Sequence, residues 1–155
     1  DEHVERSLAR FFAAQRALAR AGVIRSRDYV GDIAKYLCQA IYGLVPAERD
    51  QPYDGTIDQA RVRVVTNNCP TGHPVSVEGV RECDQVILVL GPNCWMHPAR
   101  DESTILFYRG QKQEALELFQ TKGGQILIGR NLPASEFEHV LRLPREPQGG
   151  TETVS

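Results

Sequence analysis

Four side chains of the kinds that bind transition metals occur as two short pairs, Cys69 with His73 and Cys94 with His97. Thiolates and imidazoles are the usual ligands of zinc. If the strands before these two segments run parallel and adjacent, both loops emerge at one edge of the sheet and the four side chains converge. The sequence therefore offers a Cys2His2 zinc site. Four unrelated loop residues are the alternative, because the spacings differ from those of common zinc fingers.

The second of these segments carries other chemistry as well. Cys94 is a thiol near a possible base, His97, but residues three apart in an irregular loop seldom reach each other. Trp95 and Met96 are of types that are enriched at binding surfaces. We expect these two side chains to contact a partner; the alternative is that Trp95 folds back onto the domain.

A run of arginines is the third candidate site. Arg16, Arg20, Arg25 and Arg27 follow one another closely near the start of the chain. Such a run can face nucleic-acid phosphates or an acidic partner. The alternative is an ordinary solvated face, since cations are favoured near the C-terminal end of a helix.

Composition limits the classes of function. The 155 residues include 20 acidic and 18 basic side chains, for a net charge of −2, which argues against binding nucleic acid by bulk electrostatics. With 41% apolar residues the chain can bury a core, so we expect one domain over residues 1–143 and a disordered tail over 144–155. No apolar run approaches the roughly 20 residues of a membrane span.

The cysteines and the first residues predict the compartment. Four cysteines in a chain with a real core need not form disulfides, so we expect reduced thiols and a cytoplasmic protein. The opening DEHVERSLARFF is charged and amphipathic, unlike a signal peptide. Asp1 in place of an initiator methionine predicts that residues have been removed before it.

Hydrophobic periodicity predicts an α/β fold in which a small mixed β-sheet is flanked by helices. The apolar run QVILVL at 85–90 predicts a central strand that is covered on both faces. A tight turn is expected at Asp58-Gln59. The expected helices are 2–21, 30–43, 111–120 and 135–141, and the expected strands are 53–58, 61–66, 85–90, 104–108 and 125–128.

The segment GVIRSRDYVGDIAKYLCQAIYGL and the Tyr53-Asp54 pair after it carry a resemblance to a family. An arginine-containing linker, a Gly-Asp helix and a Tyr-Asp pair on a strand are typical of small bacterial PD-(D/E)XK domains. Over roughly residues 18–90 the chain resembles this family. The resemblance implies a restriction-endonuclease-like core, in which metal-binding carboxylates and a lysine activate water for nucleic-acid cleavage.

Matched residue by residue, the resemblance implies a degenerate site. Asp54 occupies the first aspartate position, while Arg63 and Val65 stand at the carboxylate and lysine positions of the second motif. Lys35 stands at the position of the helix glutamate. Positive charge at two of these positions opposes the binding of a cation.

Two outcomes remain open for Asp54. Asp32 or Asp58 could supply the missing ligands, which would leave a Mg²⁺-dependent nuclease with a rearranged site. Alternatively, Asp54 could pair with Arg63 or Lys35 in an internal salt bridge that fills the former metal site.

The expected function is non-enzymatic and needs no cofactor. The resemblance and its missing residues imply a pseudo-nuclease that acts as a protein-binding module, for example an immunity or antitoxin protein in bacterial conflict or defence. The slight acidity suits the capture of a basic nuclease toxin better than the capture of DNA. The alternatives are the surviving nuclease and a DNA- or RNA-binding accessory domain that uses the arginine run.

Overall fold

A mixed six-stranded sheet forms the centre of the computed structural model, which describes residues 2–71, 82–99, 101–122, 125–128 and 132–145. Two helices come first, α1 (Glu2–Arg20) and α2 (Tyr29–Tyr42). The remaining elements, in chain order, are β1 (Val45–Pro46), β2 (Gly55–Ile57), β3 (Ala60–Asn67), β4 (Gln85–Leu90), β5 (Thr104–Gln111), α3 (Lys112–Leu118), β6 (Phe119–Lys122), β7 (Gln125–Ile128), a 3-10 turn (Ala134–Glu136) and β8 (His139–Arg142). The predicted α/β class, with a mixed sheet and flanking helices, is confirmed.

The strand order of the sheet is β1-β2-β3-β4-β5-β8. Among the described strands of this sheet, β3 and β4 run parallel. Every remaining pair of neighbouring strands is antiparallel. The loops that follow β3 and β4 therefore leave the sheet at the same edge, as the sequence predicted. Between β2 and β3, Asp58 (φ 48°) and Gln59 (φ 69°) both adopt the left-handed conformation of a two-residue hairpin turn.

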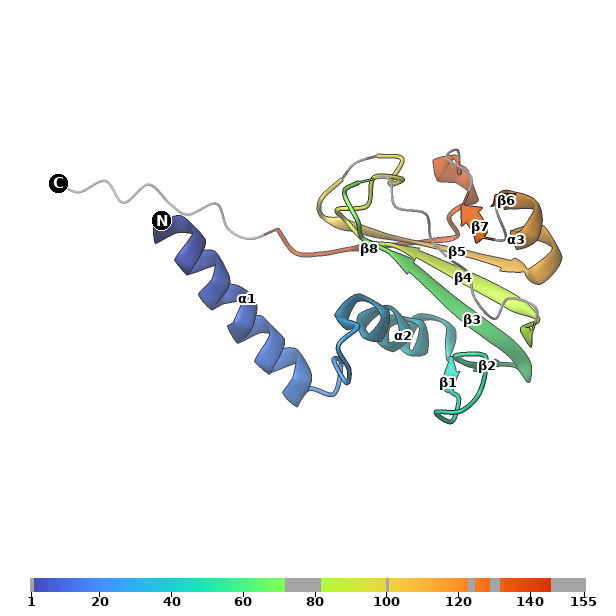
Figure 1. Ribbon diagram of the computed structural model, residues 1–155, viewed down its shortest axis with the longest axis horizontal. Coiled ribbons are helices and arrows are strands. Elements are labelled where there is room, and N and C mark those ends of the chain that lie inside the picture. The colour runs from blue at the N-terminus through green and yellow to red at the C-terminus, as the bar shows by residue number, and fades with distance from the viewer. Residues whose placement is uncertain (1, 72–81, 100, 123–124, 129–131, 146–155) are drawn as a thin grey trace.

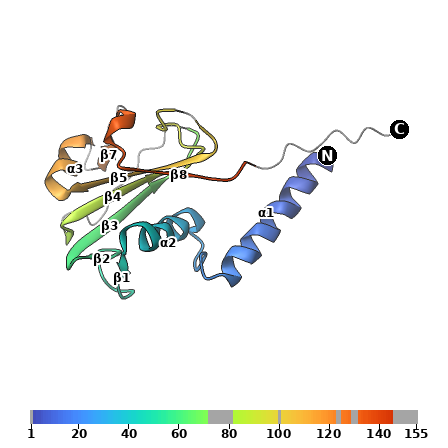
Figure 2. The same cartoon turned by 180° about the vertical axis from the view of Figure 1, so that it is seen from behind.

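Strand β4 is covered on both faces (Figures 1 and 2). Its residues Val86, Leu88 and Leu90 belong to a cluster on the side of α3, together with Ala115 and Phe137. Its other residues, Ile87 and Val89, pack with Ala34 and Cys38 of α2 and with Phe107 of β5. The alternation of a strand sends neighbouring side chains to opposite faces, so a strand buried on both faces has to be apolar throughout.

Local signals fix both ends of α2. At its start, the Asp28 carboxylate accepts a hydrogen bond from the Gly31 amide (3.0 Å). At its end, Gly43 adopts the left-handed conformation (φ 68°) and its amide donates to the Gln39 carbonyl (3.1 Å). These caps orient the helix so that Ala34 and Cys38 face the sheet.

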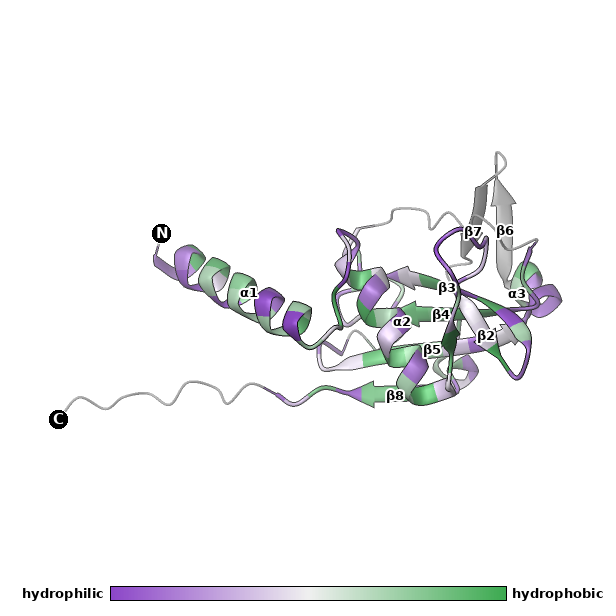
Figure 3. Cartoon of the chain, turned by 90° about the horizontal axis from the view of Figure 1, so that it is seen from below, coloured by the Kyte–Doolittle hydropathy of each residue, from purple (hydrophilic) through white to green (hydrophobic). Residues whose placement is uncertain are grey.

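Helix α1 stands away from the rest of the molecule in all three views (Figures 1, 2 and 3). The predicted helix at 2–21 is therefore present, but none of its residues is buried. None of the described helices is long and apolar enough to cross a bilayer.

The prediction of a helix at 135–141 is wrong. That segment forms the short 3-10 turn and then β8, which pairs antiparallel with β5 from Thr104↔Arg142 to Phe107↔His139. The open edge of β5 offers unpaired backbone groups, and the formation of a ladder there outweighs the weak helical pattern of a short segment.

The helix predicted at 111–120 is shorter than expected. It ends at Leu118, and the following residues form the β6–β7 hairpin. Of the tail predicted to be disordered, residues 146–155 lie outside the described residues.

Candidate functional site at Asp54

Asp54 lies directly before β2, with its side chain only 7% exposed. Its backbone is held from two directions. The amide donates to the Val62 carbonyl of β3 (2.9 Å), and the carbonyl accepts from the Ala47 amide that follows β1 (3.0 Å). The position of this carboxylate is therefore set by the sheet and not by a free loop.

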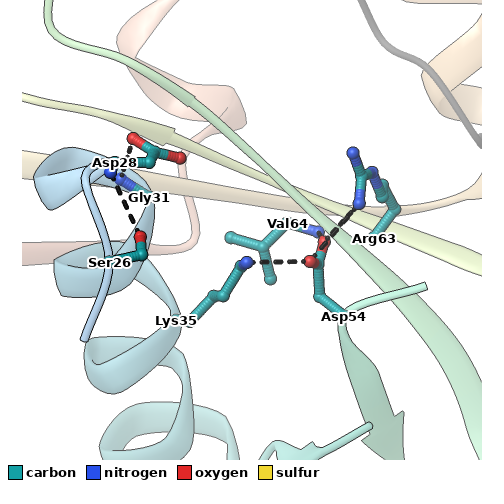
Figure 4. Close-up of polar contacts among 7 residues, drawn as sticks. All are labelled: Ser26, Asp28, Gly31, Lys35, Asp54, Arg63 and Val64. Atoms are coloured by element: carbon teal, nitrogen blue, oxygen red, sulfur yellow. Dashed lines mark hydrogen bonds and ion pairs between the residues drawn. The ribbon is translucent and has the colours of Figure 1, made fainter. Parts of the chain in front are cut away.

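Three donors surround the Asp54 carboxylate (Figure 4). Lys35 on α2 places its Nζ 3.2 Å from Oδ1. Arg63 on β3 places its Nη1 3.3 Å from both oxygens. The Val64 amide donates to Oδ2 over 2.7 Å.

These contacts occupy most of the acceptor capacity of the carboxylate. A carboxylate has about four lone-pair sites. Oδ1 faces Lys35 and Arg63, while Oδ2 faces Arg63 and the Val64 amide. The alternative in which Asp54 pairs with Lys35 or Arg63 is thus realised with both partners at once.

The charge of this cluster is unfavourable for a metal ion. Lys35 and Arg63 bring two positive charges to one buried negative charge. Their side chains are 42% and 31% exposed, so they stay partly hydrated while their charged ends reach the carboxylate. A cation placed at Asp54 would meet both of them within a few ångströms.

The other carboxylates proposed from the sequence do not join Asp54. Asp32 accepts hydrogen bonds from the Arg25 and Ser26 amides (2.7 and 2.5 Å) and so fixes the linker to the start of α2. Burial raises the pKa of Asp32, but these hydrogen bonds together hold it below its usual value. Asp58 lies in the exposed β2–β3 turn, separated from Asp54 by the whole of β2.

Val65, at the position where the resemblance expects a lysine, is buried in the cluster on the side of α3. It offers no polar atom to a water molecule or a metal ion. Among the described residues there is no group of three or more His, Cys, Asp or Glu side chains that could hold a metal ion.

A hollow of about 590 Å³ opens beside the cluster, between α2 and the segment that joins β1 to β2. Charges of both signs line it, including Arg25, Glu48 and Arg49 as well as Lys35 and Asp54. No motif in the sequence indicates this part of the surface. The charged stretch AERDQPYD, between two short strands, forms one side of the hollow, but it matches no known motif.

Cys38 lies on α2 close to the same cluster, but its thiol is inert. Burial, and after it the negative charge of Asp54, raises the pKa of Cys38 to about 12. A thiol with that pKa is protonated at neutral pH and is a poor nucleophile.

The two segments of the suggested zinc site do lie together. The Trp95 amide donates to the Cys69 carbonyl over 2.9 Å. However, His97 is buried and its Nε2 is 2.9 Å from the Thr104 hydroxyl, and Cys94 is buried as well. His73 lies outside the described residues, so the complete four-residue site stays a prediction.

The suggested nucleophile and binding residues of this loop are buried or partly buried. Burial raises the pKa of the Cys94 thiol, which lowers the population of reactive thiolate. Trp95 and Met96 are only partly exposed, and Met96 packs against the cluster on the side of α3. This arrangement favours the alternative in which the loop folds back onto the domain.

The four arginines of the suggested basic site are all exposed. Arg16 and Arg20 lie on α1, whereas Arg25 and Arg27 lie in the linker to α2. Of the four, Arg25 also lines the hollow beside Asp54.

No known protein-family model matches this chain, and no curated protein matches it.

Proposed function

We propose that this chain is a catalytically degenerate nuclease-like domain that acts as a protein-binding module of the immunity or antitoxin type. The observation that carries the proposal is the pairing of the Asp54 carboxylate with Lys35, Arg63 and the Val64 amide. A metal-dependent nuclease needs such a carboxylate free for Mg²⁺.

The surroundings of Asp54 support the resemblance on which the proposal rests. The carboxylate lies between the Gly-Asp helix, α2, and a strand, β3, that runs parallel to its neighbour β4. Lys35 and Arg63 come from the same elements that would supply metal ligands in the resembling family. The substitutions therefore convert a metal site into an internal ion-pair cluster.

Protein is the favoured partner. The chain has a net charge of −2, which weakens general attraction to phosphates, and the hollow beside Asp54 presents charges of both signs. Mixed charge suits the polar surface of a protein, and a basic nuclease toxin is the partner that we propose. This step rests on analogy between folds.

A bacterial cytoplasm is the proposed location. None of the four cysteines forms a disulfide within the described residues, and three of them are buried. Thiols stay reduced in a reducing compartment.

The test of the proposal is a cleavage assay of the purified chain on plasmid, single-stranded DNA and tRNA with Mg²⁺ or Mn²⁺. We expect no cleavage above background by the wild type, and the Asp54→Ala variant serves as the control for contaminating nucleases. Cleavage that disappears in Asp54→Ala would show a working nuclease and refute the proposal.

A nucleic-acid-binding accessory role is the second candidate, favoured by the exposure of Arg16, Arg20, Arg25 and Arg27. It predicts binding to a labelled oligonucleotide that weakens steeply with salt and is lost in an Arg16→Glu, Arg20→Glu double variant. Fluorescence anisotropy at low salt measures this binding. The absence of any binding would remove this candidate.

A further inference from the structure

Helix α1 presents an apolar face that nothing in the described structure covers. Val4, Leu8, Phe11 and Phe12 follow helical spacing and are each about half exposed, between 48% and 53%. We define these four residues as the α1 stripe. The rings of Phe11 and Phe12 touch each other edge to face, with centroids 5.4 Å apart, so the stripe is a connected surface.

An apolar groove of about 430 Å³ lies between α2, the ends of β4 and β5, and β8. Val30, Ile33 and Leu37 of α2 line one side, and Ile105, Leu141 and Leu143 line the other. Val30 and Leu143 are each 39% exposed, so the groove is open to solvent. Leu18, at the end of α1, also lines the groove and joins it to the stripe.

The chain cannot easily fold its own α1 into this groove, because the linker after α1 is tied down. The Val23 amide donates to the Leu18 carbonyl (2.9 Å), and the Arg25 and Ser26 amides donate to Asp32 on α2. Val23 and Ile24 are themselves buried. These contacts hold α1 in the direction that points away from the body (Figures 1 and 2).

We infer that the groove receives the α1 stripe of a second copy, and that two copies exchange their α1 helices around a two-fold axis. Each copy holds one stripe and one groove of the same apolar character, which is what an interface with two-fold symmetry requires. A free helix of this length is only marginally stable in water, so a partner is needed to hold it.

The area available is sufficient for a small dimer interface. Two aromatic and two aliphatic side chains, each half exposed, present on the order of 400 Å² of apolar surface per stripe. Two stripes and the two smaller groove surfaces that they cover reach roughly 1,000 Å², which is the least that a specific interface is expected to bury.

The test is the mass of the purified chain in solution, measured by light scattering over a micromolar concentration series. We expect two chains of 17.3 kDa for the wild type. Phe11→Glu in the stripe and Leu143→Glu in the groove should each give a single chain. Val45→Glu is the matched control, because Val45 is an exposed apolar residue (61%) on β1, outside both surfaces, and this variant should remain a dimer.

Mixing the two monomeric variants separates groove binding from pairing between α1 helices. The Phe11→Glu chain keeps its groove and the Leu143→Glu chain keeps its stripe, so the mixture should form heterodimers with weaker affinity than the wild type. A monomeric wild type would overturn the inference. So would a Leu143→Glu variant that stays dimeric, since the helices would then pair without the groove.

Discussion

At the residue scale, the chemistry of the Asp54 carboxylate depends on the partners that surround it. A buried carboxylate needs partners, and a metal ion or protein cations can serve. In this chain Lys35 and Arg63 take that role, with the Val64 amide as the third donor. The cluster therefore neutralises the buried carboxylate, and its two cations oppose the approach of a metal ion.

Removal of this carboxylate should destabilise the fold. Asp54→Ala leaves the Val64 amide and two cations without their partner, and we expect the free energy of unfolding to fall by about 2–3 kcal/mol. We expect this loss of stability to be smaller than the largest losses caused by breaking a buried ion pair. Lys35 and Arg63 are partly exposed, so their charged ends can turn to water. Urea unfolding measures the change.

Asp84→Ala is the matched control, since Asp84 pairs with Arg61 at the surface, where both side chains are nearly half exposed. Its effect should be clearly smaller. Equal losses of unfolding free energy in the two variants would contradict a stabilising role for Asp54.

The four thiols should differ in reactivity. Hydrogen bonding to Thr71 lowers the pKa of Cys69, which is partly exposed, whereas burial raises the pKa values of Cys38, Cys83 and Cys94. Alkylation at pH 7.5 followed by mass spectrometry should therefore modify Cys69 first. All four should react alike in urea, and early modification of Cys38 in the native chain would contradict this ranking.

Acid should unfold the chain partly through Asp101. Hydrogen bonds from the Ser103 hydroxyl and amide hold the pKa of Asp101 below its usual value. A carboxyl group with a depressed pKa contributes stability above its unfolded pKa, about 3.9, and loses it as the pH falls through the lower folded value. Asp101→Asn should therefore be less stable than the wild type at pH 6, with the difference vanishing near pH 2. A constant difference across that range, in urea unfolding, would contradict this role.

At the element scale, the β2–β3 turn stores local strain. Gln59 adopts φ 69°, a left-handed conformation that favours glycine, and a Gly at this position is common in two-residue hairpin turns. We expect Gln59→Gly to raise the free energy of unfolding by about 0.5 kcal/mol. Thermal unfolding measures this effect.

Gly43→Ala provides the opposite case, because Gly43 ends α2 with φ 68° and nothing lies within 4 Å of an added methyl group. Backbone strain alone should then lower stability by about 1 kcal/mol. A Gln59→Gly variant that loses stability to a similar extent would contradict the assignment of strain to the turn.

The elements that the sequence predicted well are those with strong local signals. The helix expected at 30–43 is present as α2, and the unbroken apolar run of β4 had to be covered on both faces. The ion pairing of Asp54 with Lys35 and Arg63 was one of two outcomes that the sequence left open, and the structure shows both pairs. Strand β8 could not be predicted in this way, because the free edge of β5 decides its conformation. The exposure of α1 could not be predicted either, because periodicity shows that a helix has an apolar face but not what covers that face.

At the scale of the whole molecule, the ion-pair cluster and the exposed stripe lie in different places. Asp54 is held between α2 and the sheet, while the α1 stripe extends from the body on the far side of the linker (Figure 1). The groove that would receive the stripe borders the hollow beside Asp54, because Val23 and Tyr36 line both. The two proposals are independent, and either can fail without the other.

The most direct test of the central claim is Mn²⁺ binding to the wild-type chain at pH 7.5, measured from the electron paramagnetic resonance signal of free Mn²⁺. Since Lys35, Arg63 and the Val64 amide surround Asp54 and two of them are positively charged, we predict no loss of free Mn²⁺ at sub-millimolar concentrations. Binding that is present in the wild type and absent in Asp54→Asn would show that the carboxylate still holds a metal ion, and would contradict the account.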